Sequence, residues 1–174
     1  MAYPIAAKLV YPLKKYKLNG LGFKAKVTSG RILGIHLGED IVAPAGTEVN
    51  CIGNGEVVYA ALHPGSPSKG NWGNIVIVSH RRPKSKDIFY SLYAHLEKLQ
   101  LKEGDKVKIG QTIGIVGTAN TPQNGWWSSH LHFAIYVGPW NGIVLPGYFR
   151  ENQNRTKLEY WRKPSEFIKF YSNK

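Results

Sequence analysis

The sequence has little cysteine, and it lacks long hydrophobic runs. Cys51 is the only cysteine among the 174 residues, so the chain cannot form an internal disulfide or a cysteine-rich metal site. We expect Cys51 to be a small buried side chain. No stretch of about 18 apolar residues is present, which argues against a membrane-spanning helix. Pro4 and Lys8 interrupt the apolar residues at the N-terminus, so no signal peptide is visible.

Acidic residues are scarce at both ends of the chain. Residues 1–30 hold six lysines and no acid, and residues 150–174 hold seven basic residues against three acidic ones. Residues 31–149 are nearly balanced, although the whole chain carries a net charge of +12. Basic flanks favour an anionic partner such as nucleic acid, an acidic membrane or an anionic cell wall, and solubility alone is the other interpretation.

Length and composition predict one globular domain. The chain has 43% apolar and 20% charged residues, and its length suffices to bury a core without a disulfide or a metal. We therefore predict a single domain over residues 1–174. In it, a basic lead-in (1–31) and a basic aromatic extension (138–174) flank a central region (32–137).

Short runs rich in Val, Ile, Tyr and Phe alternate with Gly, Pro and Asn clusters, which is typical of antiparallel strands joined by short turns. The runs are Glu56–Leu62, Asn74–Ser79, Ile88–His95, Lys106–Gly117 and His130–Val137. Only the C-terminus predicts a helix, opened by Pro164 and Ser165. Apolar residues recur there at helical spacing, namely Phe167, Phe170 and Tyr171. The predicted fold class is mainly β, a compact antiparallel sheet domain with a short C-terminal helix.

Two long loops, Pro64–Trp72 and Thr118–Ser129, interrupt this pattern. Long loops in small β domains often carry function. The second loop holds Trp126 and Trp127 just before His130. These two rings either cap the core or contact a ligand.

The segment Gly34–Asp40 places His36 four residues before Asp40. In an extended strand their side chains would lie about 13 Å apart, too far to share one metal ion. Gly38 lies between them and permits a bend that would bring them together. The spacing alone is weak evidence, because it often arises by chance.

His130 and His132 stand two residues apart in a predicted strand, so both project from one face while Leu131 and Phe133 point into the core. Neutral histidine pairs of this kind usually serve a metal ion or acid–base chemistry. Two exposed surface histidines are the alternative.

His95 ends the predicted strand Ile88–His95, where alternation puts it on the face of Tyr93, and by itself it could be an ordinary rim residue.

Two histidines and one aspartate would make a three-ligand zinc set with the fourth position left for water. Zinc lowers the pKa of such a water to about 7 and polarises a carbonyl. Two further histidines beside the site could move the proton and stabilise an oxyanion.

The segment Gly34–Pro44, Gly-Ile-His-Leu-Gly-Glu-Asp-Ile-Val-Ala-Pro, resembles the signature of the lysostaphin-like (β-lytic) zinc metallopeptidases, which cleave peptidoglycan. The resemblance continues in order over about residues 32–137. Its further segments are Gly46–Val49, Gly55–Val58, Trp72–His80, Tyr93–Leu96, Gly104–Val107, Gly110–Gly114 and His130–Phe133.

The resemblance implies one zinc ion per chain, with three ligands in a groove walled by loops. The implied ligands are His36, Asp40 and His132, and the implied catalytic histidines are His95 and His130. Residues 32–137 would form the zinc peptidase core. The implied activity is that of a zinc-dependent endopeptidase, which uses a zinc-activated water to hydrolyse peptide bonds in peptidoglycan stem peptides or cross-bridges.

Three features depart from the family pattern. Ala134 stands where relatives commonly have Glu, the loop Thr118–Ser129 is longer than the usual turn, and the residues after Gly138 diverge. The last two fall on the predicted groove walls, so they bear on substrate preference. His80 matches a recurrent family position that is not a ligand, and His63 matches none.

Three other functions compete with this interpretation. A non-catalytic relative that binds the wall or activates another hydrolase would usually lack some ligands, whereas all five site residues stand here. A biotinyl- or lipoyl-like carrier is suggested by the segment Glu103–Gln111, but a carrier would not need His130 and His132. The basic flanks would suit nucleic acid, but no recognisable binding motif supports it.

Peptidoglycan, an anionic cell wall, is the partner that these features favour, and the basic flanks would localise the chain to it. We expect no specific nucleic acid, no membrane span and a monomer. The expected location is extracellular, periplasmic or cell-wall associated. Because no signal peptide is visible, we expect a phage-type lysin or a trimmed chain.

Overall fold

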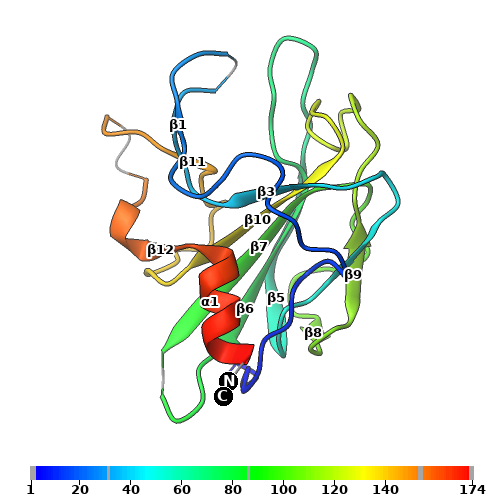
Figure 1. The fold of residues 1–174 in the computed structure, drawn as a ribbon. Coiled ribbons are helices and arrows are strands. Elements are labelled where there is room, and N and C mark those ends of the chain that lie inside the picture. The colour runs from blue at the N-terminus through cyan, green and yellow to red at the C-terminus, as the bar shows by residue number, and fades with distance from the viewer. Residues whose placement is uncertain (1–2, 31, 86, 153–154, 173–174) are drawn as a thin grey trace.

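The computed structural model describes residues 3–30, 32–85, 87–152 and 155–172 (Figure 1). The described chain is mainly β, with one short helix near its C-terminus, which confirms the predicted fold class. The elements are β1 (Lys26–Val27), β2 (Gly34–His36), β3 (Glu39–Val42), β4 (Glu48–Asn50), β5 (Gly55–His63), β6 (Gly73–Arg81), β7 (Ile88–Leu96), β8 (Lys106–Val107), β9 (Thr112–Ile115), β10 (His130–Tyr136), β11 (Tyr148–Phe149), a 3-10 turn (Leu158–Tyr160), β12 (Trp161–Arg162) and α1 (Pro164–Ser172).

The main sheet has the strand order β12-β10-β7-β6-β5-β8, and β3 also pairs with β10. Two smaller sheets, β1-β2-β11 and β4-β9, lie beside it (Figure 1). All of these strand pairs are antiparallel, as predicted. The predicted run Lys106–Gly117 divides at a turn into β8 and β9. The remaining predicted strands are present to within two residues.

Strand alternation separates the buried residues into two clusters, one on each face of the sheet. Leu131 and Phe133 of β10 belong to the first cluster, together with Cys51, which is a free and fully buried thiol as predicted. Ala134, at the position where a Glu was expected from relatives, is fully buried in the second cluster. A carboxylate there would therefore lie among apolar side chains and would require a partner.

Both ends of the chain pack onto this sheet. Leu9 and Leu13 of the N-terminal segment are buried in the first cluster, and so is Ile168 of α1. Ser172 at the end of α1 donates a hydrogen bond to the carbonyl oxygen of Leu9 at 2.8 Å. The flanks thus contribute apolar side chains to the core, while the described lysines of residues 3–30 are exposed.

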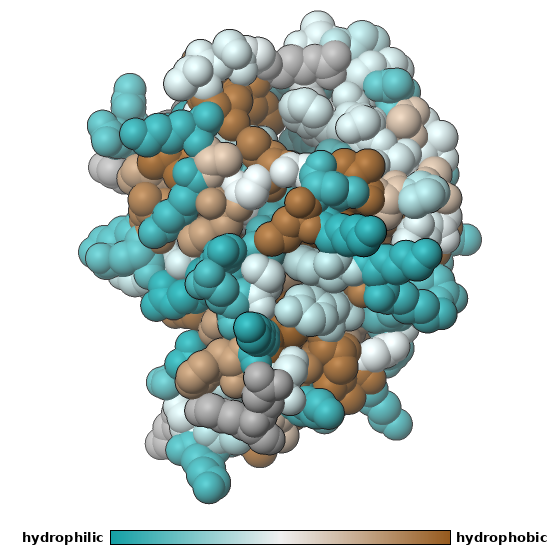
Figure 2. All heavy atoms as spheres, in the orientation of Figure 1, coloured by the Kyte–Doolittle hydropathy of each residue, from teal (hydrophilic) through white to brown (hydrophobic). Residues whose placement is uncertain are grey.

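On the face that carries α1, hydrophilic side chains are spread widely, with hydrophobic ones between them (Figure 2). No helix among the described residues is long and apolar enough to cross a membrane.

Candidate metal centre and groove

The bend between β2 and β3 brings His36 and Asp40 together. Nε2 of His36 lies 3.3 Å from Oδ1 of Asp40, far closer than an extended strand would allow. Gly38 makes this possible through its small size. A Cβ on Gly38 would lie 2.6 Å from the carbonyl oxygen of Phe133 and 2.7 Å from Nε2 of His132. Any larger residue would push β3 away from β10.

Pairing between β3 and β10 adds the third donor. The register sets His132 directly opposite Asp40. Nδ1 of His132 then lies 2.9 Å from Oδ1 of Asp40 and 3.0 Å from Nε2 of His36. Three side chains from three strands therefore converge, and the described residues contain one such group of potential metal ligands.

The chemistry of these donors fits a zinc ion. Nδ1 of His36 donates to the carbonyl oxygen of Gly22 at 3.0 Å, so the neutral ring presents a lone pair at Nε2. Asp40 faces that lone pair with an acceptor oxygen, and two acceptors this close require a cation or a shared proton between them. Zinc ligands about 2.0–2.1 Å from the metal in tetrahedral geometry lie about 3.3 Å from one another. The observed separations are close to that value.

Burial sets the charge of this cluster. Burial opposes ionisation of Asp40, but the adjoining rings of His132 and His36 outweigh it and hold the pKa of the carboxyl well below its ordinary value. Burial also lowers the pKa of His132 to about 4, against the pull of Asp40. At neutral pH the cluster is thus a carboxylate with a neutral His132, the state that a metal ligand requires.

The N-terminal segment supports this cluster, which the sequence analysis did not predict. The carbonyl oxygen of Leu21 accepts the backbone N–H of Asp40 at 2.9 Å, next to the Gly22 carbonyl that holds His36. A Cβ on Gly20 would lie 2.6 Å from the carbonyl oxygen of Asp40. The lead-in therefore fixes two of the three donors, although no motif in the sequence signals it.

The side chain of His95 lies beside the metal centre because the alternation of β7 breaks near the end of the strand. Alternation predicts it on the face of Tyr93, and this is wrong. A register irregularity in the β6–β7 pairing and a left-handed φ of 65° at His95 turn its side chain to the opposite face. Its ring lies 4.5 Å from that of His130, whereas Tyr93 packs on Phe133 in the core.

His95 and His130 share one hydrogen-bonding pattern. Nδ1 of His95 donates to the carbonyl oxygen of Asn124 at 2.9 Å, and Nδ1 of His130 donates to that of Ser128 at 2.7 Å. A carbonyl only accepts, so the tautomer that fits each of these contacts has its proton on Nδ1 and its lone pair on Nε2. Nε2 of His130 lies 3.9 Å from Oδ1 of Asp40. Burial, together with the neighbouring histidines, lowers the pKa of His95 well below its ordinary value.

A groove of about 670 Å³ opens beside these side chains. The N-terminal segment and β11 form one wall, and the loops 64–72 and 118–129 form the other, at the upper end of the molecule in Figure 1. The lining residues are Gly20, Leu21, Ile32, Asp40, Val42, Lys69, Gly70, Asn71, Trp72, His95, Trp127, Ser128, His130, His132, Pro146, Gly147, Tyr148, Arg150 and Arg155.

The two long loops form one wall because glycines let them touch. Nε1 of Trp127 donates to the carbonyl oxygen of Asn71 at 2.9 Å, and a Cβ on Gly70 would collide with the Trp127 ring. Trp127 lines the groove, whereas Trp126 is absent from the lining. Of the two interpretations of this tryptophan pair, contact with the groove therefore applies to Trp127.

Tyr148 is a groove residue that the sequence analysis missed. β11 pairs with β2 so that Tyr148 lies opposite His36, with the two rings 5.2 Å apart. Burial and the charge of Asp40 raise the pKa of Tyr148 to about 12, so it remains a phenol. Sequence alone offered no signal for it, because the pairing of β11 with β2 spans more than a hundred residues.

The remaining two histidines lie elsewhere. His80 is fully buried, and both of its ring nitrogens are engaged, by the Asn54 carbonyl at 2.9 Å and by Oγ of Ser91 at 2.7 Å. His63 contacts the hydroxyl of Tyr59 at 2.7 Å and is not among the groove residues.

An antiparallel β fold with a His–Asp–His donor set and two further histidines beside it is the arrangement expected of a metallopeptidase. Comparison with known proteins agrees. The model of peptidase family M23 matches residues 34–143, and the chain belongs to this family. The family resemblance predicted from the motifs is thus confirmed.

Two curated relatives differ in their stated roles. The peptidoglycan DD-endopeptidase ShyB of Vibrio cholerae is 30% identical over 131 residues, which are 73% of this chain and 27% of that protein. The murein hydrolase activator NlpD of Escherichia coli is 33% identical over 108 residues, which are 62% of this chain and 24% of that protein. The chain thus spans about a quarter of the length of these relatives.

Solved structures share the fold. The catalytic domain of the antimicrobial peptidase lysostaphin from Staphylococcus simulans aligns with a TM-score of 0.56 and 26% identity, over 86% of this chain and 90% of that chain. A zinc-containing peptidase from Vibrio cholerae aligns with a TM-score of 0.55 and 29% identity, over 78% of this chain and 36% of that chain.

Proposed function

We propose that this chain is a zinc-dependent endopeptidase that hydrolyses peptide bonds in peptidoglycan stem peptides or cross-bridges. The observation that carries the proposal is the convergence of His36, Asp40 and His132 within 3.3 Å of one another. His95 and His130 stand beside them at the same groove. The family and the named endopeptidase relative support the reaction class.

The hydrogen bonds support a role for each of these residues. His36, Asp40 and His132 would hold one zinc ion per chain, which supplies a Lewis acid for the scissile carbonyl and lowers the pKa of a water. His130 presents an unprotonated Nε2 on the groove side of Asp40, where it can take a proton from the attacking water.

His95 is suited to the opposite transfer or to the developing oxyanion. Its Nδ1 is fixed by Asn124, its ring packs beside His130, and Trp72 and Trp127 border it. The two tryptophan rings place apolar surface beside His95, and hydrogen bonds to a developing charge are stronger in such surroundings than in water.

A second candidate function is activation of another wall hydrolase. The activator name of one relative favours it. Under this function the groove would bind wall peptides without cleaving them, and fragments would appear only when a second hydrolase is present.

Digestion of purified cell walls of several chemotypes separates the two functions. Zinc-loaded protein is incubated alone, and the soluble fragments are identified by mass. We expect about one zinc per chain and fragments whose new ends are an amine and a carboxylate within the peptide. Asp40→Asn, which keeps the shape but weakens the metal site, is the control. Walls left intact by zinc-loaded protein would contradict the endopeptidase proposal.

The cell wall is the proposed partner, and the envelope or the extracellular space the proposed location. Relatives include the outer membrane antigenic lipoprotein B of Histophilus somni, 34% identical over 119 residues. The basic flanks would add electrostatic affinity for an anionic wall, with the chain acting as a monomer. Wall pull-down should weaken at high salt while turnover of a soluble peptide changes little. Salt-independent binding would instead place affinity in the groove, with Trp127 the first residue to test.

A further inference from the structure

The groove carries positive charge that the metal centre does not use. Lys69, Arg150 and Arg155 line it and are exposed, and Asp40 is the one acid among the described lining residues. The charge of Asp40 is already shared with His36 and His132. A ligand in the groove therefore meets three cations without a matching anion.

Nearby acids do not neutralise these cations. No ion pair within 4.0 Å joins Lys69, Arg150 or Arg155 to any acid in the part of the chain that the structure describes. Glu39, the neighbour of Asp40 on β3, is fully buried and accepts hydrogen bonds from Tyr16 at 2.6 Å and from Ser165 at 2.9 and 2.8 Å. Alternation along β3 thus turns this second carboxylate away from the groove.

One hydrogen bond restrains the exposed side chain of Arg150. Its Nε donates to the carbonyl oxygen of Leu33 at 2.8 Å, which fixes the guanidinium and leaves its terminal nitrogens available. A fixed guanidinium loses less entropy when it binds a carboxylate through two hydrogen bonds. Arg150 therefore has the properties of an anion anchor.

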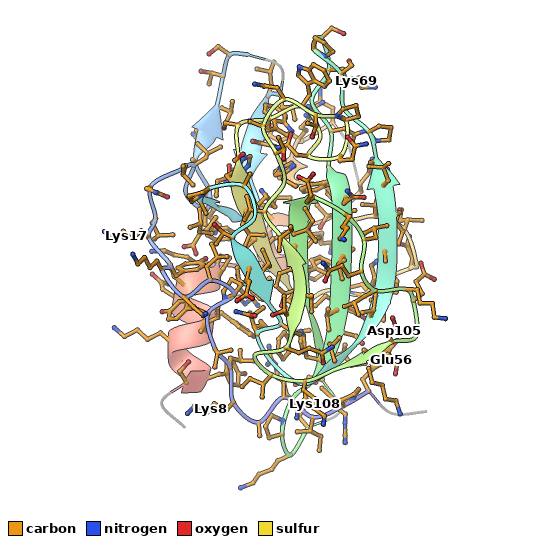
Figure 3. All side chains as sticks on the ribbon, turned by 90° about the vertical axis from the view of Figure 1, so that its right-hand side faces the viewer. Lys8, Lys17, Glu56, Lys69, Asp105 and Lys108 are labelled. Atoms are coloured by element: carbon orange, nitrogen blue, oxygen red, sulfur yellow. The ribbon has the colours of Figure 1, made fainter. Side chains whose placement is uncertain are left out.

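Arg150 follows closely along the chain from Tyr148, the groove residue opposite His36. Tyr148 pairs with His36, and Arg150 follows two residues later along the same wall. Two residues of extended chain span about 7 Å, the length of two residues of a bound peptide. Lys69 stands on the other wall, at the top of the molecule in Figure 3 and far from Lys8 and Lys108 at the bottom.

We infer that Arg150 and Arg155, with Lys69 opposite, form a subsite for a carboxylate of the substrate, one or two residues from the scissile bond. The inference rests on the proposed function for the existence of a scissile bond. With this subsite, acidic peptides, rather than uncharged ones such as oligoglycine, are the expected substrate class of the groove. Arg150 and Arg155 belong to the divergent residues after Gly138 and Lys69 to the loop 64–72, so these two segments would set substrate preference.

Two peptides with an uncharged label and blocked ends test the subsite. One is an oligoglycine peptide that carries a single glutamate, and the other has glutamine in its place. Binding to zinc-loaded protein is measured by fluorescence anisotropy, and hydrolysis by chromatography. We expect the glutamate peptide to bind about tenfold more tightly or better, with a difference that shrinks at high salt.

Variants assign the preference to the groove. Arg150→Gln with Arg155→Gln should abolish the difference between the two peptides while zinc content stays unchanged. If loss of the Arg150–Leu33 contact destabilises the double variant, Arg155→Gln alone replaces it in the test. The single variant should reduce the difference in affinity between the two peptides. Lys108→Gln, an equal change of charge at the far end of the molecule, should leave it unchanged (Figure 3).

Equal affinity for the two peptides, or a preference that survives these variants, would overturn the subsite. Tighter binding of the glutamate peptide without cleavage of any peptide or wall would instead contradict the proposed endopeptidase activity and leave the subsite in place. Binding and hydrolysis thus report on the two proposals separately.

Discussion

Outside the His36–Asp40–His132 donor set, the buried histidines of the described chain are of two kinds, which differ in one nitrogen. In His80, Nδ1 and Nε2 both have partners, the Asn54 carbonyl and Oγ of Ser91. In His95 and His130, Nδ1 is likewise held by a carbonyl, but Nε2 makes no hydrogen bond to the described residues, and both side chains line the groove. The same residue type, anchored in the same way, is structural where the second nitrogen is engaged and available for chemistry where it is not.

The largest expected effect concerns the donors of the metal centre. His132→Ala leaves two of the three donors, too few to hold zinc firmly, so both metal and activity should fall to background. Metal analysis and a wall-hydrolysis assay on the same preparation check this. His80→Gln is the matched control, because it removes a buried histidine outside the groove and should keep its zinc. Zinc retained in His132→Ala would contradict the assignment.

The next effect separates a catalyst from a ligand. His130→Ala and His95→Ala leave the donor set intact, so zinc should stay while the rate falls about 10²–10⁴-fold, the usual contribution of a general acid or base. Metal content and rate are measured side by side with His132→Ala. If His130→Ala lost its zinc and His132→Ala kept it, the two roles would have to be exchanged.

Substitution of His80, the structural histidine, should change the stability of the protein rather than its activity. Burial lowers the pKa of His80 from 6.5 to about 4 in the folded protein. Because the folded pKa lies below the unfolded one, its contribution is complete above about pH 6.5 and is lost as pH falls towards 4, on the order of 3 kcal/mol in all. In urea titrations, the stability of His80→Gln should fall less steeply than that of the wild type over this range. Parallel curves would contradict the structural role of His80.

The smallest expected effect tests the partner that engages His80. Ser91→Ala removes the hydrogen bond at Nε2 of a fully buried ring, which should cost about 1–2 kcal/mol of unfolding free energy. Zinc content and activity should stay at wild-type values, since Ser91 is not among the residues that line the groove. A loss of activity larger than the loss of folded protein would show that the two kinds of histidine are coupled.

Sequence reasoning predicted the β10 pair well, because alternation is a local property. His130 and His132 share a face, while Leu131 and Phe133 lie in the core as predicted. The bend at Gly38 was also predicted, although the reason differs. Flexibility was expected, whereas the structure shows that Gly38 leaves space for the Phe133 carbonyl and the His132 ring.

The face of His95 was predicted wrongly for a physical reason. A strand keeps its alternation only while its register is regular, and the irregularity near the end of β7 shifts it by one residue. The left-handed backbone at His95 is held by contacts from outside the strand, with its N–H bonded to the Trp72 carbonyl and its carbonyl accepting from Gly117. Nothing in the residues around His95 encodes those contacts.

The sequence by itself determined the fold class, the buried faces of the long strands and, through its motifs, the peptidase family. These depend on periodicity and short segments, which are local. Only the tertiary structure decided that Gly22 anchors His36, that Tyr148 and Arg150 line the groove, and that His95 faces His130. Each of these depends on segments brought together by packing across the fold, and burial then fixes which nitrogen of each histidine remains available.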